Sequence, residues 1–220
     1  MRAAARPATL LLVRHPHTTA NDDGGVRMNG WTDAPLSPRG ELEAALLRER
    51  LSAELADAAV YASPLQRARV VAEGLAASGG PAVACDRDLM EIGCGDVDGW
   101  DVERVRRVHP ILWRRNELQD DEDFRWPGGE SYREFRARCL GAVERIAAAH
   151  AGERVVVVTH AGVVSQVLGH LSGTSAARWD LFRPGNASIT TLAWTGGAGR
   201  VLGFDDRAHL VGERRSCSSS

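Results

Sequence analysis

Two histidines, two arginines and one carboxylate stand where they could share a site in the folded chain. Arg14 and His15 directly follow the apolar run 10–13, and His160 follows the β-branched run 154–159. The carboxyl ends of parallel strands face one edge of an α/β sheet, and ligands bind there. Arg67 and Glu91 come shortly after two further strand candidates. We therefore expect all five side chains to meet at one edge of a sheet.

This combination of side chains suits a phosphoryl group. Arginine offers a planar fork of N–H donors that matches phosphoryl oxygens. Imidazole can act as a nucleophile or, when protonated, as a donor to an anion. A carboxylic acid can protonate a departing alkoxide. The helices that follow the strands add free N–H groups and a positive dipole at their N-termini.

A metal site is the weaker interpretation of the same region. His15 and His17 form a His-x-His pair that can ligate a metal ion, but no further ligand set at a matching spacing accompanies it. No metal site is therefore predicted.

The predicted elements alternate strands with helices. Helix starts are indicated at Ser37-Pro38, at Ser63-Pro64 and at the capping box of Ser131 and Glu134. The first helix carries leucines at helical spacing, at positions 42, 46, 47 and 51. The strand candidates are 9–13, a short run near 61, 81–86, 154–159, 187–194 and 200–206. This order predicts a three-layer α/β/α sandwich with a mostly parallel central sheet, in one domain covering residues 1–220.

Residues 91–129 break the regular pattern. The stretch holds three tryptophans and the acidic run "DDED". It is either a solvated loop with small helices or a lid or specificity insert, which we place around 99–130. Trp113-Arg114-Arg115 could bind an anion there or form a solvated face. A flexible tail is predicted at about 213–220.

Composition and charge exclude several classes of function. The net charge is −2 and every basic residue is arginine, so there is no strong basic excess for binding nucleic acid. The four cysteines are scattered without a Cys-x-x-Cys pair, which is typical of a reducing compartment. No run approaches transmembrane length. We expect a cytoplasmic protein that binds neither nucleic acid nor membrane, and a homodimer remains open.

Four segments in this order resemble the histidine phosphatase superfamily, the phosphoglycerate-mutase-like family. They are "RHPHTTAN" from Arg14, "SPLQRA" with Arg67, "LMEIGCGDVDGW" with Glu91 and "VVVVTHAG" with His160. The resemblance implies an α/β fold and a metal-independent phosphatase that acts on a small phosphomonoester and needs no cofactor. It also implies roles for individual residues. These are a phosphohistidine on His15, phosphate binding by Arg14, Arg67, His160, Asn21, Thr18 and Ala161, and acid/base catalysis by Glu91.

The sequence departs from the family pattern at two positions. Pro16 replaces a glycine and His17 replaces the usual glutamate. Proline keeps the carbonyl, loses an N–H and restricts His15 to extended geometry. A histidine whose ring must only reach phosphorus need not be disabled by this change, although any backbone N–H contact of the glycine would be lost. His17 could be a specificity contact or a surface residue, and we favour the surface residue.

Other interpretations stay open at this point. The chain could be a phosphoglycerate-type mutase, a metal-dependent hydrolase using His15 and His17, or a non-catalytic phosphate-ligand or protein-binding module. Asp96 and Asp98 are rivals for the role of Glu91. His160 could simply cap the following helix, and the two arginines could be structural ion-pair partners.

Overall fold

A six-stranded sheet forms the centre of the molecule in the computed structural model, which describes residues 6–21, 26–55, 58–76 and 82–215. The strand order is β3-β2-β4-β1-β5-β6, and the first four strands in this order run parallel. Strands β5 and β6 add to the other side in antiparallel pairing. The bounds are β1 Ala8–Arg14, β2 Ala59–Ala62, β3 Ala84–Cys85, β4 Arg154–Thr159, β5 Ile189–Thr195 and β6 Ala198–Asp206. The prediction of a mostly parallel sheet is confirmed.

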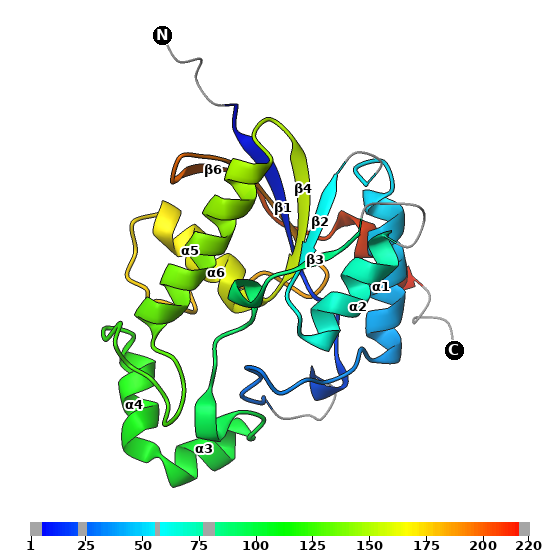
Figure 1. Cartoon of the computed structure of the whole chain (residues 1–220). Helices are drawn as coiled ribbons and strands as arrows, with labels where there is room; N and C mark the ends of the chain where they lie inside the picture. Colours follow the sequence, from blue (N-terminus) through cyan, green and yellow to red (C-terminus); the bar gives the residue numbers. More distant parts are fainter. Residues whose placement is uncertain (1–5, 22–25, 56–57, 77–81, 216–220) are drawn as a thin grey trace.

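Helices cover both faces of the sheet (Figure 1). Helices α1 (Pro38–Leu51) and α2 (Gln66–Ala76) pack through one apolar cluster, and α5 (Tyr132–Ala149) and α6 (Ala161–Leu171) pack through another. The residues of β4 are apolar almost throughout because the strand is buried on both faces. The predicted three-layer sandwich is therefore correct.

Several local predictions can be compared directly with the structure. Helix α1 has its cap at Ser37 and α5 has the capping box of Ser131 and Glu134, both as predicted. The buried face of α1 differs from the prediction, because Leu42 is exposed and Glu43 is fully buried. A leucine at helical spacing is buried only if the helix turns that side toward the sheet.

The predicted cap of α2 is wrong. The helix begins at Gln66, and the N–H groups of Gln66 and Arg67 donate to the carboxylate of Asp33. The hydroxyl of Ser63 instead contacts the ring of His160 and accepts the N–H of Leu65, which precedes the helix. The cap is supplied by a residue more than thirty positions earlier in the chain.

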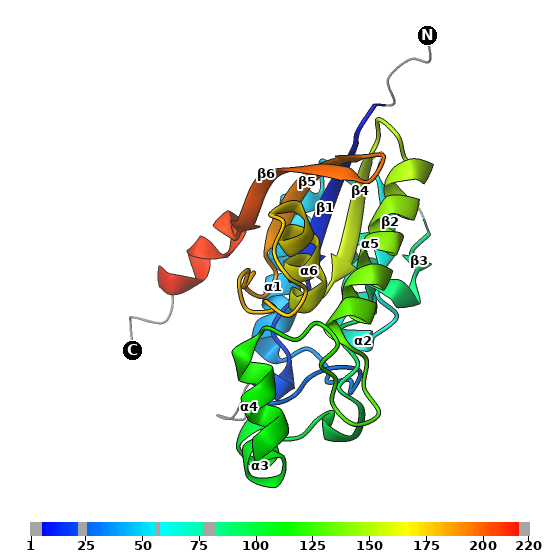
Figure 2. The same ribbon diagram turned by 90° about the vertical axis from the view of Figure 1, so that its left-hand side faces the viewer.

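The segment predicted as a lid or specificity insert contains two helices, α3 (Val102–Val108) and α4 (Pro110–Leu118). They lie beyond the end of the sheet to which β4 points (Figure 2). A separate apolar cluster with Trp113, Phe124 and Trp126 holds this part together, while Arg114 and Arg115 are exposed. Arg115 donates to Asp121. The function of the segment as a lid stays a prediction.

Four short 3-10 helices complete the described chain: η1 Thr19–Asn21, η2 Arg87–Leu89, η3 Gly95–Val97 and η4 Ala208–Arg215. The predicted tail overlaps η4, and its last residues, 216–220, lie outside the described part. Within the described ranges, no helix is both long enough and apolar enough to cross a membrane.

Candidate active site

The carboxyl ends of β1 and β4 bring two histidines together at one edge of the sheet. The two strands are parallel neighbours, with Arg14 aligned to Thr159, so His15 and His160 leave the sheet side by side. Their ring centroids are 5.3 Å apart, although 145 residues separate them in sequence. The prediction that these histidines meet is thus matched by the geometry.

A cavity of about 80 Å³ opens next to the rings. Its lining residues are Arg14, His15, Thr18, Ala20, Asn21, Asn29, Thr32, Ala34, Arg67, Glu91 and Ala161. Every residue to which the resemblance assigns a role lines this cavity except His160, whose fully buried ring lies next to that of His15.

The hydrogen bond of His15 defines its tautomer. Nδ1 lies 2.7 Å from the carbonyl oxygen of Pro16, which can only accept, so we assign the proton to Nδ1. Nε2 then carries the lone pair in the neutral ring. Burial, together with the charges of Arg14 and Arg67, lowers the pKa of His15 well below its ordinary value. The replacement of glycine by Pro16 thus preserves the group that orients the ring.

His160 is oriented by a residue that the sequence suggested for another role. Its Nε2 lies 2.8 Å from Oγ of Ser63, and that oxygen also accepts the N–H of Leu65. The hydroxyl of Ser63 has a proton to donate and Nε2 lies within hydrogen-bond distance, so we assign the ring proton of His160 to Nδ1. Burial, and then the charge of Arg67, lower the pKa of His160 well below its ordinary value.

Two buried guanidinium groups supply positive charge. Arg14 donates from Nη1 to the Pro184 carbonyl at 2.7 Å, and Arg67 donates from Nη2 to the Gly30 carbonyl at 2.7 Å. Burial lowers the pKa of both groups, and the charge of Glu91 opposes this effect. Within the described part of the chain, the buried Nε of each arginine and Nδ1 of His160 have no hydrogen-bond partner. These three buried nitrogens therefore keep a hydrogen-bonding capacity that the protein itself does not use.

The Glu91 carboxylate packs against the start of α6. Its oxygens accept the N–H of Ile92 at 2.9 Å and the N–H of Gly162 at 3.0 Å. A Cβ on Gly162 would lie only 2.0 Å from Oε1 of Glu91, so the carboxylate occupies the space that this glycine leaves. His160 stands at the cap position of α6 but makes no capping bond with its side chain. Glu91, and not His160, binds the helix N-terminus.

Thr18 and Asn21 form a small unit beside His15. Both the N–H and the hydroxyl of Thr18 donate to Oδ1 of Asn21 at 3.0 Å. The carbonyl end of Asn21 is therefore engaged, which leaves its NH₂ group for other acceptors. This pairing explains why the two residues occur three positions apart on the same short turn.

The rivals named from the sequence lie outside the cavity lining. Asp96 is exposed, and Asp98 accepts three backbone N–H groups from the loop 30–32. The ring of His17 contacts Oγ of Ser37, whereas Nδ1 of His15 faces Pro16. Among the described residues, no three His, Cys, Asp or Glu side chains gather as a metal site.

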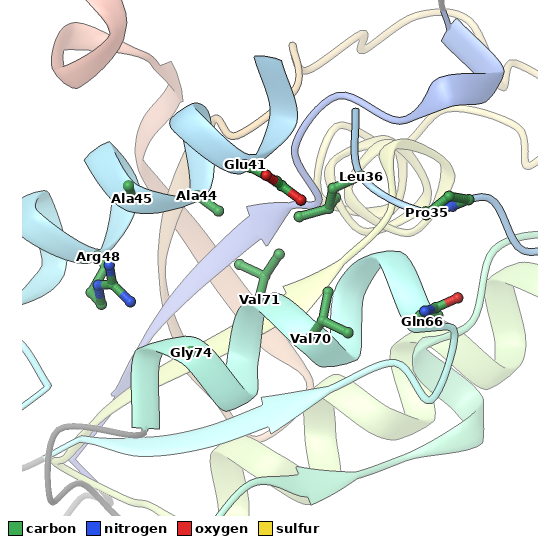
Figure 3. Close-up of a pocket in the computed structure, with 10 residues that line it drawn as sticks. All are labelled: Pro35, Leu36, Glu41, Ala44, Ala45, Arg48, Gln66, Val70, Val71 and Gly74. Carbon is green, nitrogen blue, oxygen red and sulfur yellow. The ribbon is translucent and has the colours of Figure 1, made fainter. Parts of the chain in front are cut away.

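A larger hollow of about 390 Å³ lies elsewhere, between α1 and α2 (Figure 3). Aliphatic side chains such as Leu36, Val70 and Val71 form much of its lining, with Glu41 and Arg48 at α1. It brings together no nucleophile with an acid or base. The side chains that could act on a phosphoryl group line the smaller cavity, which is therefore the candidate active site although it is not the larger hollow.

Comparisons with known proteins agree with this geometry. Residues 10–207 match the model of the histidine phosphatase superfamily (branch 1). Phosphoglycerate mutase-like protein 4 of Arabidopsis thaliana is 36% identical over 159 residues, which cover 71% of this chain and 68% of that protein. The metal-independent phosphoserine phosphatase of the same plant is 34% identical over 203 residues, covering 91% and 82%.

A solved structure has the same fold. The YhfR protein of Bacillus stearothermophilus superposes with a TM-score of 0.80 at 30% identity, covering 92% of this chain and 99% of that chain. The extent of the family match and the identities leave no other assignment. This chain belongs to the histidine phosphatase superfamily, branch 1, as an enzyme of the phosphoric monoester hydrolase class.

Proposed function

We propose that this protein hydrolyses a small phosphomonoester in two steps, through a phosphohistidine on His15 and without a metal ion. The observation that carries the proposal is the orientation of His15. Its Nδ1 lies 2.7 Å from the Pro16 carbonyl oxygen, which leaves Nε2 as the other ring nitrogen of a residue that lines the cavity. Burial and the charges of Arg14 and Arg67 lower the pKa of the ring and so favour its neutral form. A neutral, oriented imidazole is a competent nucleophile.

The phosphoryl oxygens would be bound by the buried donors around that ring. Arg14 and Arg67 each offer an Nε–H, and His160 offers Nδ1–H. Donors that are already oriented in a water-poor site stabilise the charge that develops on phosphorus at little cost of reorganisation. In this proposal the arginines provide the positive charge that a metal ion provides in other phosphatases. The NH₂ group of Asn21, whose carbonyl end is held by Thr18, and the N–H of Ala161 complete the phosphate pocket in this proposal.

Glu91 is the proposed general acid. In the first step His15 forms the bond to phosphorus while Glu91 gives its proton to the departing alcohol. In the second step Glu91 takes a proton from a water molecule, which attacks phosphorus and releases His15 and inorganic phosphate. The position of Glu91 in the cavity lining supports this role, while Asp96 and Asp98 lie outside that lining.

The charges of the predicted insert favour hydrolysis over phosphoryl transfer to a second alcohol. A mutase needs cations for an acidic substrate, but Arg115 donates to Asp121 and an acidic run follows it. The interpretation as a mutase draws support from the names of several relatives and from "WRRN" at 113–116. Because Arg115, the second arginine of this stretch, already pairs with Asp121, we consider hydrolysis the better-supported reaction.

The test is capture of the phosphoenzyme. Brief reaction with phosphorus-labelled p-nitrophenyl phosphate, followed by a denaturing quench, should leave an adduct that is labile in acid and stable in base. His15→Ala should give no adduct, whereas His17→Ala, the matched control from the same segment, should still give one. An adduct on serine or cysteine, or a fully active His15→Ala protein, would refute the proposal.

A further inference from the structure

Asp98 has unusual surroundings for a carboxylate that does not line the active-site cavity. Its Oδ1 accepts the N–H of Gly30, and its Oδ2 accepts the N–H groups of Trp31 and Thr32, each at 2.7 Å. Three successive N–H groups of one loop therefore converge on a single side chain. Hydrogen bonds to a charged acceptor are about twice as strong as neutral ones, so this contact determines the conformation of the loop.

The same loop holds the guanidinium of Arg67 with its carbonyl groups. Arg67 donates from Nη2 to the Gly30 carbonyl at 2.7 Å and from Nη1 to the Thr32 carbonyl at 3.0 Å. Asp33, the next residue, accepts the N–H groups at the start of α2 and forms an ion pair with Arg67. The N–H groups of the loop are thus committed to Asp98 and its carbonyls to Arg67.

The loop also contacts the segment that carries Glu91. Nε1 of Trp31 donates to the Glu91 carbonyl at 2.8 Å. A Cβ at Gly30 would lie 2.5 Å from the Ile92 carbonyl oxygen, so the two backbones approach as closely as a glycine allows. One short loop therefore connects the backbone of the proposed acid with a phosphate-binding arginine.

We propose that Asp98 is a positioning residue for the active site, acting through the loop 30–33 on Arg67. Its carboxylate touches neither the cavity nor a reacting atom and is not a proton donor in the reaction. The inference rests on the proposed function, because it assigns Arg67 to the phosphoryl group. The negative charge of Asp98 also favours the charged form of Arg67.

Asp98→Asn is the sharpest perturbation. Asparagine keeps the shape of the side chain but has only one acceptor oxygen, so an NH₂ group must face at least one loop N–H. Asp96→Asn is the matched control, since Asp96 is exposed in η3, the 3-10 turn that Asp98 directly follows.

The first readout is catalysis. The kcat/KM of Asp98→Asn should fall by about 10- to 100-fold, the range expected when a reacting group shifts by roughly 1 Å. The loss should be equal on p-nitrophenyl phosphate and on an alkyl phosphate, because phosphate binding is impaired and proton donation is not. Asp96→Asn should match the parent protein on both substrates.

The second readout does not need turnover. Vanadate binding, measured by calorimetry, should weaken by at least 10-fold in Asp98→Asn. In an Arg67→Ala background the same substitution should change vanadate affinity by less than about 2-fold, because residues that act through one another are not additive. A purely structural role would lower the melting temperature but leave vanadate affinity of the folded protein unchanged.

Other outcomes overturn the inference. A loss confined to the alkyl phosphate would show that Asp98 acts on proton donation and not on phosphate binding, and full additivity with Arg67→Ala would show that it does not act through that arginine. Unchanged catalysis and vanadate affinity would remove any role. Failure of the proposed function looks different, since the parent protein itself would then form no adduct on His15.

Discussion

Gly162→Ala should displace the proposed acid, Glu91, without changing its chemical identity. The new Cβ would lie 2.0 Å from Oε1 of Glu91, and ordinary contact begins at 3.4 Å. The carboxylate must therefore move by about 1.4 Å, the difference between these distances. The carboxylate can move because Oε1 is at the far end of a flexible side chain, whereas the backbone of the helix is held by its hydrogen bonds. A displacement of about 1 Å costs on the order of 10²-fold in rate.

The expected result depends on the leaving group. An alkyl phosphate releases a basic alkoxide that needs a proton, so kcat/KM should fall by about 10²-fold. p-Nitrophenolate leaves without much protonation, and the loss on p-nitrophenyl phosphate should be several-fold smaller. Glu91→Gln removes the proton altogether and should show the same pattern with a loss of about 10²- to 10⁴-fold on the alkyl ester.

Gly162→Ala should lose only a modest part of the free energy of unfolding. The preference of a helix for alanine over glycine, about 1 kcal/mol, offsets the loss of one hydrogen bond of about 1 kcal/mol from Gly162 N–H to Glu91. The new Cβ would also lie 3.1 Å from Cε1 of Phe135, so that ring must shift by a few tenths of an ångström. Gly74→Ala in α2 is the matched control, because a Cβ there meets no atom within 4 Å. It should keep full activity and gain up to about 1 kcal/mol in the free energy of unfolding.

The assay is steady-state kinetics on both substrates, with thermal unfolding of all variants. Equal losses on the two substrates would refute the reasoning, because a misplaced acid must discriminate between leaving groups. Unchanged activity in Gly162→Ala would do the same, since it would show that the displaced carboxylate takes no part in the reaction.

Three further predictions concern metal, substrate and pH. EDTA should leave the activity intact and vanadate should inhibit; recovery of a chelator-inactivated enzyme by a divalent ion would instead favour the His-x-His reading. With 3-phosphoglycerate and a trace of 2,3-bisphosphoglycerate, phosphorus NMR should show inorganic phosphate, and faster formation of 2-phosphoglycerate would identify a mutase. Because the pKa values of His15 and His160 are lowered in the folded state, the unfolded chain binds more protons below about pH 6.5. The contribution of these histidines to the free energy of unfolding should therefore be fully present above that pH and decline below it, by up to about 1.4 kcal/mol per pH unit for each histidine. If His160→Gln left the slope of the free energy of unfolding against pH unchanged, the lowered pKa of His160 would be contradicted.

Much of the fold was predictable because its signals are local. The β-branched run at 154–159, the capping box at Ser131 and the cap at Ser37 each depend on neighbours within a few residues. The catalytic edge follows from them, since side chains that end parallel strands must lie at one side of the sheet. Arg14, His15 and His160 were placed together on this ground.

Local sequence patterns could not predict which polar groups form hydrogen bonds with each other. Ser63 has every sequence feature of a helix cap, yet its hydroxyl contacts His160, 97 residues away. Leu42 has the spacing of a core residue, but it is the buried carboxylate of Glu43 that faces inward and accepts the N–H of His17. Each outcome depends on how two elements pack, which the spacing of residues along one of them does not encode.

The amino-acid sequence by itself determined the class of fold, the edge at which the chemistry gathers and the side chains that could act on a phosphoryl group. Only the tertiary structure decided how those side chains are held. Three contacts arise from segments that meet only after folding. They are the hydrogen bond that orients His160, the packing of Glu91 against Gly162, and the contact of Asp98 with Gly30, 68 residues apart. Hydrophobic periodicity is a property of one segment, but a hydrogen bond between a side chain and a distant backbone exists only once both are placed.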